Sequence, residues 1–178
     1  MGIMERFDLY DENRKPLGRT KARTEKLEKG EHRIVVHILV FNKEGKMLVQ
    51  KRVQQKRVWP GYWDISCGGC VVAGESSRQG AHRELFEELG IDYDFSNKEP
   101  LFTIYFGTGF DDYYIVDGVD IDPAKIKLQA EEVETIDFMS ESEILEKIDK
   151  DEFVKYHKGL ISFMFTGRFH KGAWDVEV

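Results

Sequence analysis

The stretch "CGGCVVAGESSRQGAHRELFEELGI", residues 67–91, decides the fold because a glycine-rich segment leads into an amphipathic, acidic helix. The spacing predicts a helix over 76–89, and Gly90 ends it because glycine readily adopts the left-handed conformation found at helix C-termini. One helix face carries an apolar stripe, Ala81, Leu85 and Leu89. Another face carries three carboxylates at i, i+3 and i+4 spacing, Glu84, Glu87 and Glu88.

Three carboxylates on one helix face repel one another unless a cation gathers them. Carboxylate oxygens suit hard ions such as Mg²⁺, so the acidic face predicts a divalent-cation site. The alternative is a plain solvated face, because a run of charges usually lies in water. Spacing alone leaves both interpretations open.

The glycines and charges around the helix follow a long and specific pattern. Five residues separate the first glycine of this pattern from its first glutamate, and seven more precede an Arg-Glu pair. At every defined position the stretch resembles the signature box of the Nudix hydrolase family. The positions that carry the resemblance are Gly69, Glu75, Arg83, Glu84, Leu85, Glu87, Glu88, Gly90 and Ile91.

This resemblance implies the Nudix fold, a mixed β-sheet sandwiched between helices with a loop–helix–loop metal site. It implies a hydrolase that uses Mg²⁺ or Mn²⁺ to direct water onto a diphosphate linked to another group. A carboxylate-bound cation suits this chemistry because it lowers the pKa of bound water and clamps phosphate oxygens. The implied metal ligands are Glu84, Glu87, Glu88 and the backbone carbonyl of Gly68. Two further residues are implied to join loop and helix through an ion pair, Glu75 and Arg83.

Apolar runs outside the box predict strands over 33–41, 46–52, 62–66, 101–107, 112–119 and 133–138, the first two as a hairpin. Ser140 and Glu143 form a capping-box pattern, which predicts a helix over 141–149. A last helix is expected within 151–165, where apolar residues recur at helical spacing: Phe153, Tyr156, Leu160 and Met164. Strands with interspersed helices indicate an α/β (α+β) fold.

The length of 178 residues suggests a single domain, with its core over about 30–165 and a polar N-terminal lead-in. We expect residues 14–33 to be a solvated loop or arm, or else a flap that brings cations to an anionic substrate. The net charge of −7 argues against long nucleic acid as a partner. No apolar run reaches the roughly 20 residues of a membrane helix. We see no secretory leader and expect a cytoplasmic protein.

Over about residues 7–91 the chain is similar to the isopentenyl-diphosphate-isomerase-like Nudix proteins. The matching segments are "DLYDENRKPLGRTK", "HRIVVHILVFNKEGKMLVQKR" and "WPGYWDISCGG". The similarity places Arg52 and Lys56 at diphosphate-binding positions, whereas the alternative is two ordinary surface cations. The isomerases carry a cysteine and a metal-binding histidine where this chain has Gly68 and Cys70. Their box is also degraded, whereas this box is complete, and both departures favour hydrolysis.

A further acidic group is expected outside the box. Glu131 and Glu132 lie in a segment where Nudix enzymes often place another acidic ligand or the base. The alternative is a pair of solvated loop charges. The residues expected to be catalytic are therefore Glu84, Glu87, Glu88 and Glu132.

The only two cysteines, Cys67 and Cys70, have the C-x-x-C spacing of zinc and redox sites. One such pair makes an incomplete zinc site, because structural zinc binds four ligands. A redox pair would lie at the start of a helix, whereas the predicted helix here starts several residues later. We therefore expect Cys67 and Cys70 to be small buried or half-buried residues without a metal or redox role. The alternative is an oxidisable thiol beside the active site.

The expected function is metal-dependent hydrolysis of a diphosphate linkage in a nucleoside diphosphate derivative or a related organic diphosphate. The alternatives are isopentenyl-diphosphate isomerase activity and a non-catalytic nucleotide-binding module. The expected partner is a small diphosphate. The C-terminal tail, residues 166–178, is expected to pack on the core or on a second subunit, so a homodimer stays open.

Overall fold

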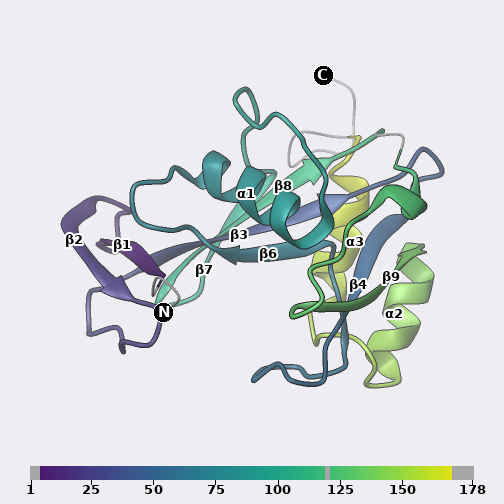
Figure 1. Ribbon diagram of the computed structural model, residues 1–178, viewed down its shortest axis with the longest axis horizontal. Coiled ribbons are helices and arrows are strands. Elements are labelled where there is room, and N and C mark those ends of the chain that lie inside the picture. The colour runs from purple at the N-terminus through teal and green to yellow at the C-terminus, as the bar shows by residue number, and fades with distance from the viewer. Residues whose placement is uncertain (1–4, 119–120, 170–178) are drawn as a thin grey trace.

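A computed structural model of the chain describes residues 5–118 and 121–169 (Figure 1). The strands are β1 (Arg6–Tyr10), β2 (Pro16–Ala22), β3 (Arg33–Val40), β4 (Met47–Arg52), β5 (Trp63–Asp64), β6 (Cys67–Cys70), β7 (Phe102–Tyr105), β8 (Gly109–Val116) and β9 (Val133–Met139). The helices are α1 (Ser77–Leu89), α2 (Glu141–Asp149), α3 (Lys158–Thr166) and the 3₁₀ helix η1 (Pro123–Lys125).

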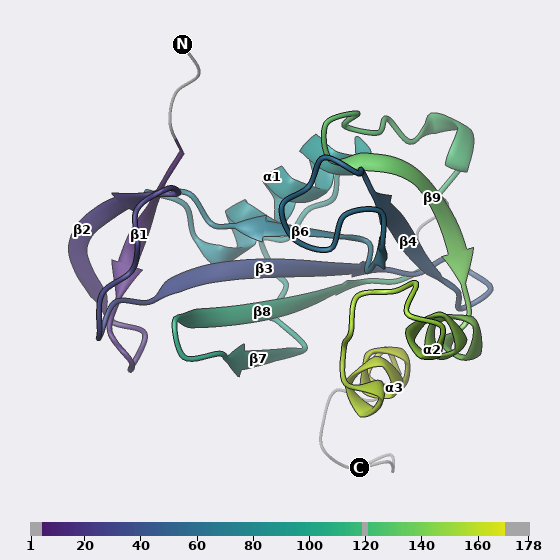
Figure 2. The ribbon, with the colours of Figure 1, turned by 90° about the horizontal axis from the view of Figure 1, so that it is seen from below.

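The centre of the fold is a mixed sheet with the strand order β6-β3-β8-β7, in which β3 is antiparallel to β6 and parallel to β8. A second sheet has the order β5-β4-β9, and β1 and β2 form a separate hairpin. Figure 2 shows α1 on one side of the central sheet and α3 on the other, with α2 beside α3. The predicted α+β class, with a mixed sheet sandwiched between helices, is confirmed.

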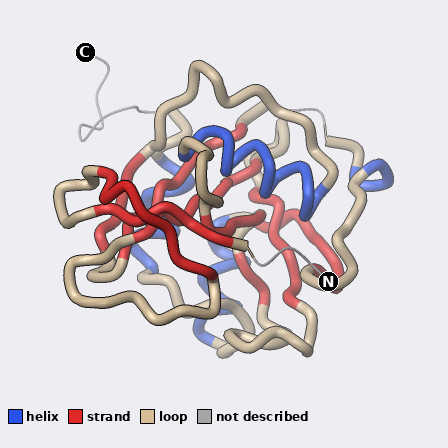
Figure 3. Tube along the Cα trace, turned by 60° about the vertical axis from the view of Figure 1, so that its left-hand side comes forward, coloured by secondary structure: helices blue, strands red, loops and turns tan. Residues whose placement is uncertain are grey.

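Strand β3 divides the interior into two cores because successive side chains point to opposite faces of a sheet. On one face Val36, Ile38 and Val40 pack in the core beneath α1, which lies across the strands (Figure 3). On the other face Leu39 packs in a second core that contains residues of α2 and α3. Both faces of the central strand are therefore buried, and its near-continuous apolar sequence follows from this position.

Helix α1 begins and ends at the residues that its local sequence specifies. The Ser76 side chain accepts from the Gln79 backbone N–H, and the Gln79 side chain accepts from the backbone N–H of Ser76, which completes a capping box. At the other end Gly90 has φ of 67°, the left-handed cap predicted from the sequence. The predicted stripe of Ala81, Leu85 and Leu89 is fully buried, so this helix is fixed firmly against the sheet.

The prediction that residues 33–41 and 46–52 pair as a hairpin is wrong. β3 and β4 share only the bridge between Phe41 and Met47 and then continue into different sheets. The reason is that β6 and β8 occupy both edges of β3, which leaves no edge for β4. Strand β4 pairs instead with β5 and β9.

The lead-in is a folded hairpin rather than a solvated loop or arm. Phe7 and Leu9 of β1 are buried, and β1 continues into a bridge between Tyr10 and His32. The cations of β2 are also paired, since Lys21 Nζ lies 2.5 Å and Arg19 Nη2 3.0 Å from the buried carboxylate of Glu31. In Figure 1 this hairpin lies at the end of the central sheet remote from α2 and α3.

The second half of the chain follows the predictions more closely. Helix α2 spans the predicted residues, and Ser140 with Glu143 forms the predicted capping box. Helix α3 begins later than the apolar spacing suggested, because residues 152–154 are extended and Phe153 bridges Trp63. The predicted strand 112–119 is β8, which begins three residues earlier, at Gly109. Residues 119 and 120 lie outside the described residues, as does most of the C-terminal tail, residues 170–178.

A buried carboxylate ties the hairpin, α1 and the central sheet together. Asp112 of β8 is fully buried and accepts hydrogen bonds from the Arg14 guanidinium, Ser77 Oγ (2.5 Å) and Thr103 Oγ1 (2.6 Å). Burial by itself would raise the pKa of this carboxyl, but these hydrogen bonds and the charge of Arg14 lower it below its ordinary value. The charged form of Asp112 therefore stabilises the fold.

We predict that Asp112→Asn lowers the free energy of unfolding at pH 7 by about 2 kcal/mol, since one partner of a largely buried ion pair is lost while Arg14 keeps some solvent. A carboxyl whose pKa is depressed by folding stabilises above its unfolded pKa and loses this effect as pH falls through the folded pKa. The stability gap between wild type and variant should therefore close below about pH 4. Urea unfolding from pH 7 to pH 3 measures it, and a gap independent of pH would contradict the assignment.

Candidate active site

The acidic face of α1 places two carboxylates in the interior of the protein. Glu88 exposes 6% of its surface, and the Glu84 side chain exposes 13%. Burial raises the pKa of both carboxyl groups, and the charge of Glu84 adds to the effect on Glu88, whose pKa rises to about 8. Two like charges held close in a low-dielectric setting favour the binding of a cation.

Arg83 contacts three glutamates of the box and the backbone of β6. Its Nε donates to both carboxylate oxygens of Glu75, at 2.9 and 3.2 Å, so the ion pair expected from the resemblance is present. Its Nη1 lies 2.8 Å from Glu84 Oε1 and 3.1 Å from Glu87 Oε2. Its Nη2 donates to the backbone oxygen of Cys70 at 2.9 Å. The Glu87 side chain is half exposed, so of the three predicted carboxylates it is the most open to solvent.

The glycine-rich segment is an edge strand rather than a loop. Among the described residues, β6 pairs with β3 on one side and with no strand on the other. Val71 N–H donates to Ile34 O, and antiparallel pairs alternate between hydrogen-bonded and non-hydrogen-bonded positions, so Gly68 opposite His37 is a non-hydrogen-bonded position. Its carbonyl therefore points to the free edge, the edge at which the Cys70 carbonyl meets Arg83. This leaves the Gly68 carbonyl available as a ligand.

The two glycines of β6 lack side chains for different reasons. A Cβ on Gly69 would lie 2.3 Å from Glu84 Oε1, so this position lets the strand approach the carboxylate. A Cβ on Gly68 would lie 2.6 Å from the backbone oxygen of Val36, so this position lets β6 approach β3. The strand and the acidic helix can meet closely only where these side chains are absent.

A paired cation and carboxylate lie near the buried carboxylates. Lys56, in the loop after β4, forms an ion pair with Glu132, whose backbone oxygen accepts from Val53 N–H at 3.2 Å. Burial and, next, the charge of Arg52 lower the pKa of Lys56, whereas Glu88 and Glu84 oppose that change. Lys56 thus lies within electrostatic reach of Glu84 and Glu88, and Glu132 is joined to it by the ion pair, while Glu131 is exposed.

Arg52 pairs with Asp64, which in turn accepts a hydrogen bond from Tyr156, and the sequence analysis assigned no role to either residue. Its Nη1 lies 3.1 Å from Asp64 Oδ2, and its Nε donates to the backbone oxygen of Val58 at 3.2 Å. Tyr156 donates its hydroxyl to Asp64 Oδ1 at 2.9 Å. The tyrosine is 92 residues from the aspartate in sequence, and no local pattern links them.

The two cysteines are free thiols with different surroundings. Cys67 is buried in the core beneath α1, and Cys70 is half-buried on the other face of β6. Burial raises the pKa of both thiols, which leaves little reactive thiolate. The expectation of buried or half-buried residues is confirmed.

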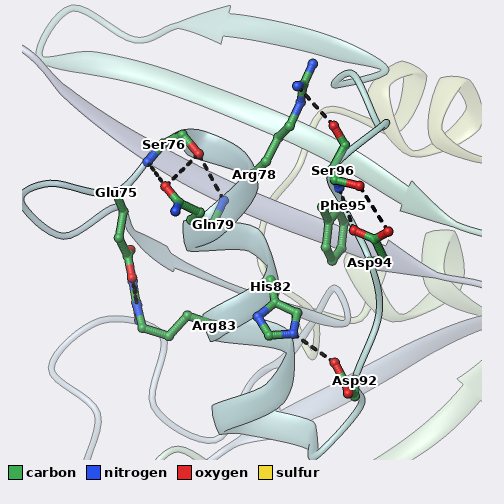
Figure 4. Close-up of a pocket in the computed structure, with 10 residues that line it drawn as sticks. All are labelled: Glu75, Ser76, Arg78, Gln79, His82, Arg83, Asp92, Asp94, Phe95 and Ser96. Carbon is green, nitrogen blue, oxygen red and sulfur yellow. Dashed lines mark hydrogen bonds and ion pairs between the residues drawn. The ribbon is translucent and has the colours of Figure 1, made fainter.

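A cavity of about 670 Å³ lies between α1 and residues 92–96 (Figure 4). The polar side chains that line it already have hydrogen-bond or ion-pair partners. His82 Nε2 lies 2.8 Å from Asp92 Oδ1, and Arg78 donates to the backbone oxygens of Ser96 and Lys98. Of the box residues singled out above, only Glu75 and Arg83 line it. The cavity therefore adds no free ligand to the carboxylate site.

The donors at the carboxylate site fit a hard divalent cation. They are oxygens of carboxylates and of a backbone carbonyl, the ligands that Mg²⁺ and Mn²⁺ prefer. Within residues 5–118 and 121–169, no three acidic, histidine or cysteine side chains are already gathered as a metal cluster. Glu84 and Glu87 point to Arg83, and Glu88 accepts from Gln50 Nε2 at 3.0 Å. Cation binding therefore has to compete with Arg83.

The fold and the box define a Nudix-type hydrolase, and comparisons with known proteins agree. The sequence model of the NUDIX domain matches residues 31–158. An uncharacterized Nudix hydrolase from Listeria innocua is 42% identical over 153 residues, which cover 86% of this chain and 90% of that protein. The chain therefore belongs to the Nudix family. Enzymes of this family act on small diphosphates and generally use divalent metal ions.

A more distant protein of known structure has the same fold. A crystal structure of a Deinococcus radiodurans protein aligns with a TM-score of 0.73 at 23% identity, covering 90% of this chain and 97% of that chain. An isopentenyl-diphosphate Delta-isomerase from Pectobacterium atrosepticum is 29% identical over 147 residues, which cover 79% of each protein. Among the described residues, no helix is both long and apolar enough to span a bilayer.

We predict that Gly68→Ala destabilises the fold more than Gly69→Ala. The new methyl at position 68 meets a backbone oxygen that cannot move without disturbing β3, whereas at position 69 it meets the end of a flexible side chain. Overpacking of this kind costs about 1–3 kcal/mol, and we expect Gly68→Ala at the upper end and Gly69→Ala at the lower end. Urea midpoints of both variants in EDTA measure the difference. Equal losses would contradict the described packing.

Proposed function

We propose that this protein is a divalent-cation-dependent hydrolase that cleaves the diphosphate linkage of a nucleoside diphosphate derivative or a related organic diphosphate. The observation that carries the proposal is the pair of buried carboxylates, Glu84 and Glu88, beside the edge carbonyl of Gly68. Charges buried in this way are costly unless a counter-charge is bound. The complete box of the family supports the same reaction.

The proposed roles follow the arrangement of the groups. Glu84, Glu87, Glu88 and the Gly68 carbonyl hold Mg²⁺ or Mn²⁺, which supplies a more acidic bound water and neutralises phosphate charge. Arg52 and Lys56 bind phosphate oxygens. Glu132, now paired with Lys56, is the further catalytic carboxylate that accepts a proton when phosphate engages the lysine. Glu75 and Arg83 hold β6 to α1.

Isomerisation of isopentenyl diphosphate is the second candidate, because one relative carries that name. The site argues against it, since Cys67 is buried beneath α1 and glycine occupies the position at which the isomerases carry cysteine. A panel of diphosphates with Mg²⁺, assayed for both cleavage and isomerised product, separates the two. No turnover with any member would favour a binding module. A cytoplasmic location and a homodimer stay predictions.

We predict that EDTA abolishes hydrolysis and that Mg²⁺ or Mn²⁺ restores it. The reason is that Arg52 and Lys56 can bind phosphate oxygens, but neither can supply the more acidic bound water that the proposed divalent cation provides. The measurement is phosphate or nucleotide release before chelation, after chelation and after metal is added back. Turnover that survives exhaustive chelation would refute the proposed mechanism.

We predict that Glu88→Gln lowers activity and that Glu75→Gln lowers stability. Glu88→Gln keeps the size of the side chain but removes a ligand charge, so kcat/KM should fall by roughly 10²-fold or more. Its metal-free thermal midpoint should change little at pH 7, because the raised pKa of Glu88 already keeps this carboxyl largely neutral and glutamine has nearly the same shape. Glu75→Gln weakens a partly exposed ion pair worth about 0–1 kcal/mol, so its small cost should appear in stability.

The control for both variants is circular dichroism, which confirms that α1 stays helical. If Glu75→Gln loses turnover while Glu88→Gln stays close to wild type, the assigned roles are reversed.

A further inference from the structure

Gln50 is a buried polar residue in an otherwise apolar strand. It follows Met47, Leu48 and Val49 of β4, all fully buried, and it exposes only 5% of its own surface. A glutamine in such a position loses its contacts with water and needs other hydrogen-bond partners. The box does not include Gln50, and the sequence analysis gave it no role.

One half of the Gln50 amide has a partner and the other half does not. Nε2 donates to Glu88 Oε2 at 3.0 Å, a contact that joins β4 to α1 across the site. Oε1 is buried and has no hydrogen-bond partner among the described residues. An unpaired buried acceptor is costly. The atom therefore lies ready for a donor that arrives with a ligand.

The ligand that fits is a hydrated divalent cation. Mg²⁺ keeps several of its waters when it binds to carboxylates, and each of those waters offers hydrogens to nearby acceptors. Residues that hydrogen-bond to metal ligands orient them and tune the affinity of the site. The amide of Gln50 offers both functions, because the carbonyl oxygen and the amide nitrogen belong to one rigid group.

We propose that Gln50 is a positioning residue of the cation site. Its Nε2 orients the Glu88 carboxylate, and its free Oε1 accepts a hydrogen bond from water carried by a bound Mg²⁺ or Mn²⁺. This inference rests on the proposed function, since it takes Glu88 as a ligand. It adds a residue from the second sheet to a site that the box describes only on α1 and β6.

The test is the affinity for Mn²⁺ alone, measured by isothermal titration calorimetry on the full chain. Gln50→Leu removes both hydrogen-bonding groups, and we expect its Kd for Mn²⁺ to rise 10- to 100-fold. Gln50→Met, which keeps the length of the side chain, should show the same loss and replaces the leucine variant if that variant does not fold.

The matched control is Ser66→Ala. Ser66 is also fully buried beside β4, where its Oγ donates to Leu48 O and accepts from Val40 N–H. It does not contact the carboxylates, so Ser66→Ala should lower the thermal midpoint and leave the Kd for Mn²⁺ within about twofold of wild type.

Two outcomes overturn the inference. One is an unchanged Kd in folded Gln50→Met. The other is an equal loss in Ser66→Ala, which would assign the effect to general weakening of the sheet. If the wild type binds Mn²⁺ through Gln50 yet hydrolyses no diphosphate, the inference stands and the proposed function fails.

Discussion

The burial of Glu84 and Glu88 next to each other is the constraint on which the rest of the site depends. Removing a carboxylate from water costs several kcal/mol even after the protein relaxes. The free energy of unfolding of a typical domain is only about 5–15 kcal/mol, so the cost of burying two such groups is large in comparison. In the proposed function, a cation bound between strand β6 and helix α1 would offset this cost, because its charge would relieve the repulsion between the two carboxylates.

The fold maintains this unfavourable arrangement by fixing α1 on three sides. Leu85 and Leu89 lock the helix into the core beneath it. Arg83 joins the helix to the loop and to the edge of β6. At its N-terminus, Ser77 is bonded to the buried carboxylate of Asp112, which also holds the N-terminal hairpin. These attachments fix the position of the helix that carries the two carboxylates.

Much of the central helix could be predicted because its signals are local. The cap at Gly90, the stripe at i, i+4 and i+8, and the capping box of α2 all lie within a few residues of the structure they specify. The hairpin between β3 and β4 was predicted wrongly, since an apolar run does not show which strand edges are already occupied. The strands flanking residues 11–15 were missed because β1 is only five residues long and β2 carries no apolar run.

Residues that act over long sequence distances were harder to find. Tyr156 meets Asp64 and Arg14 meets Asp112 only after the chain has folded. Gln50 did carry a signal, a single amide at the end of an apolar run, but its meaning depends on Glu88 from another element. The box supplied the site residues on α1, whereas the residues that support them come from strands and loops with no fixed spacing.

The most direct test of the account is the position of a bound ion. A crystal grown with Mn²⁺ and measured at a wavelength that records its anomalous scattering locates the ion without assumptions about the fold. The account predicts a peak ligated by the carboxylates of Glu84, Glu87 and Glu88 and by the Gly68 carbonyl, with Arg83 released from Glu84 and Glu87. A peak elsewhere, for example between His82 and Asp92, or no peak at saturating Mn²⁺, would contradict it.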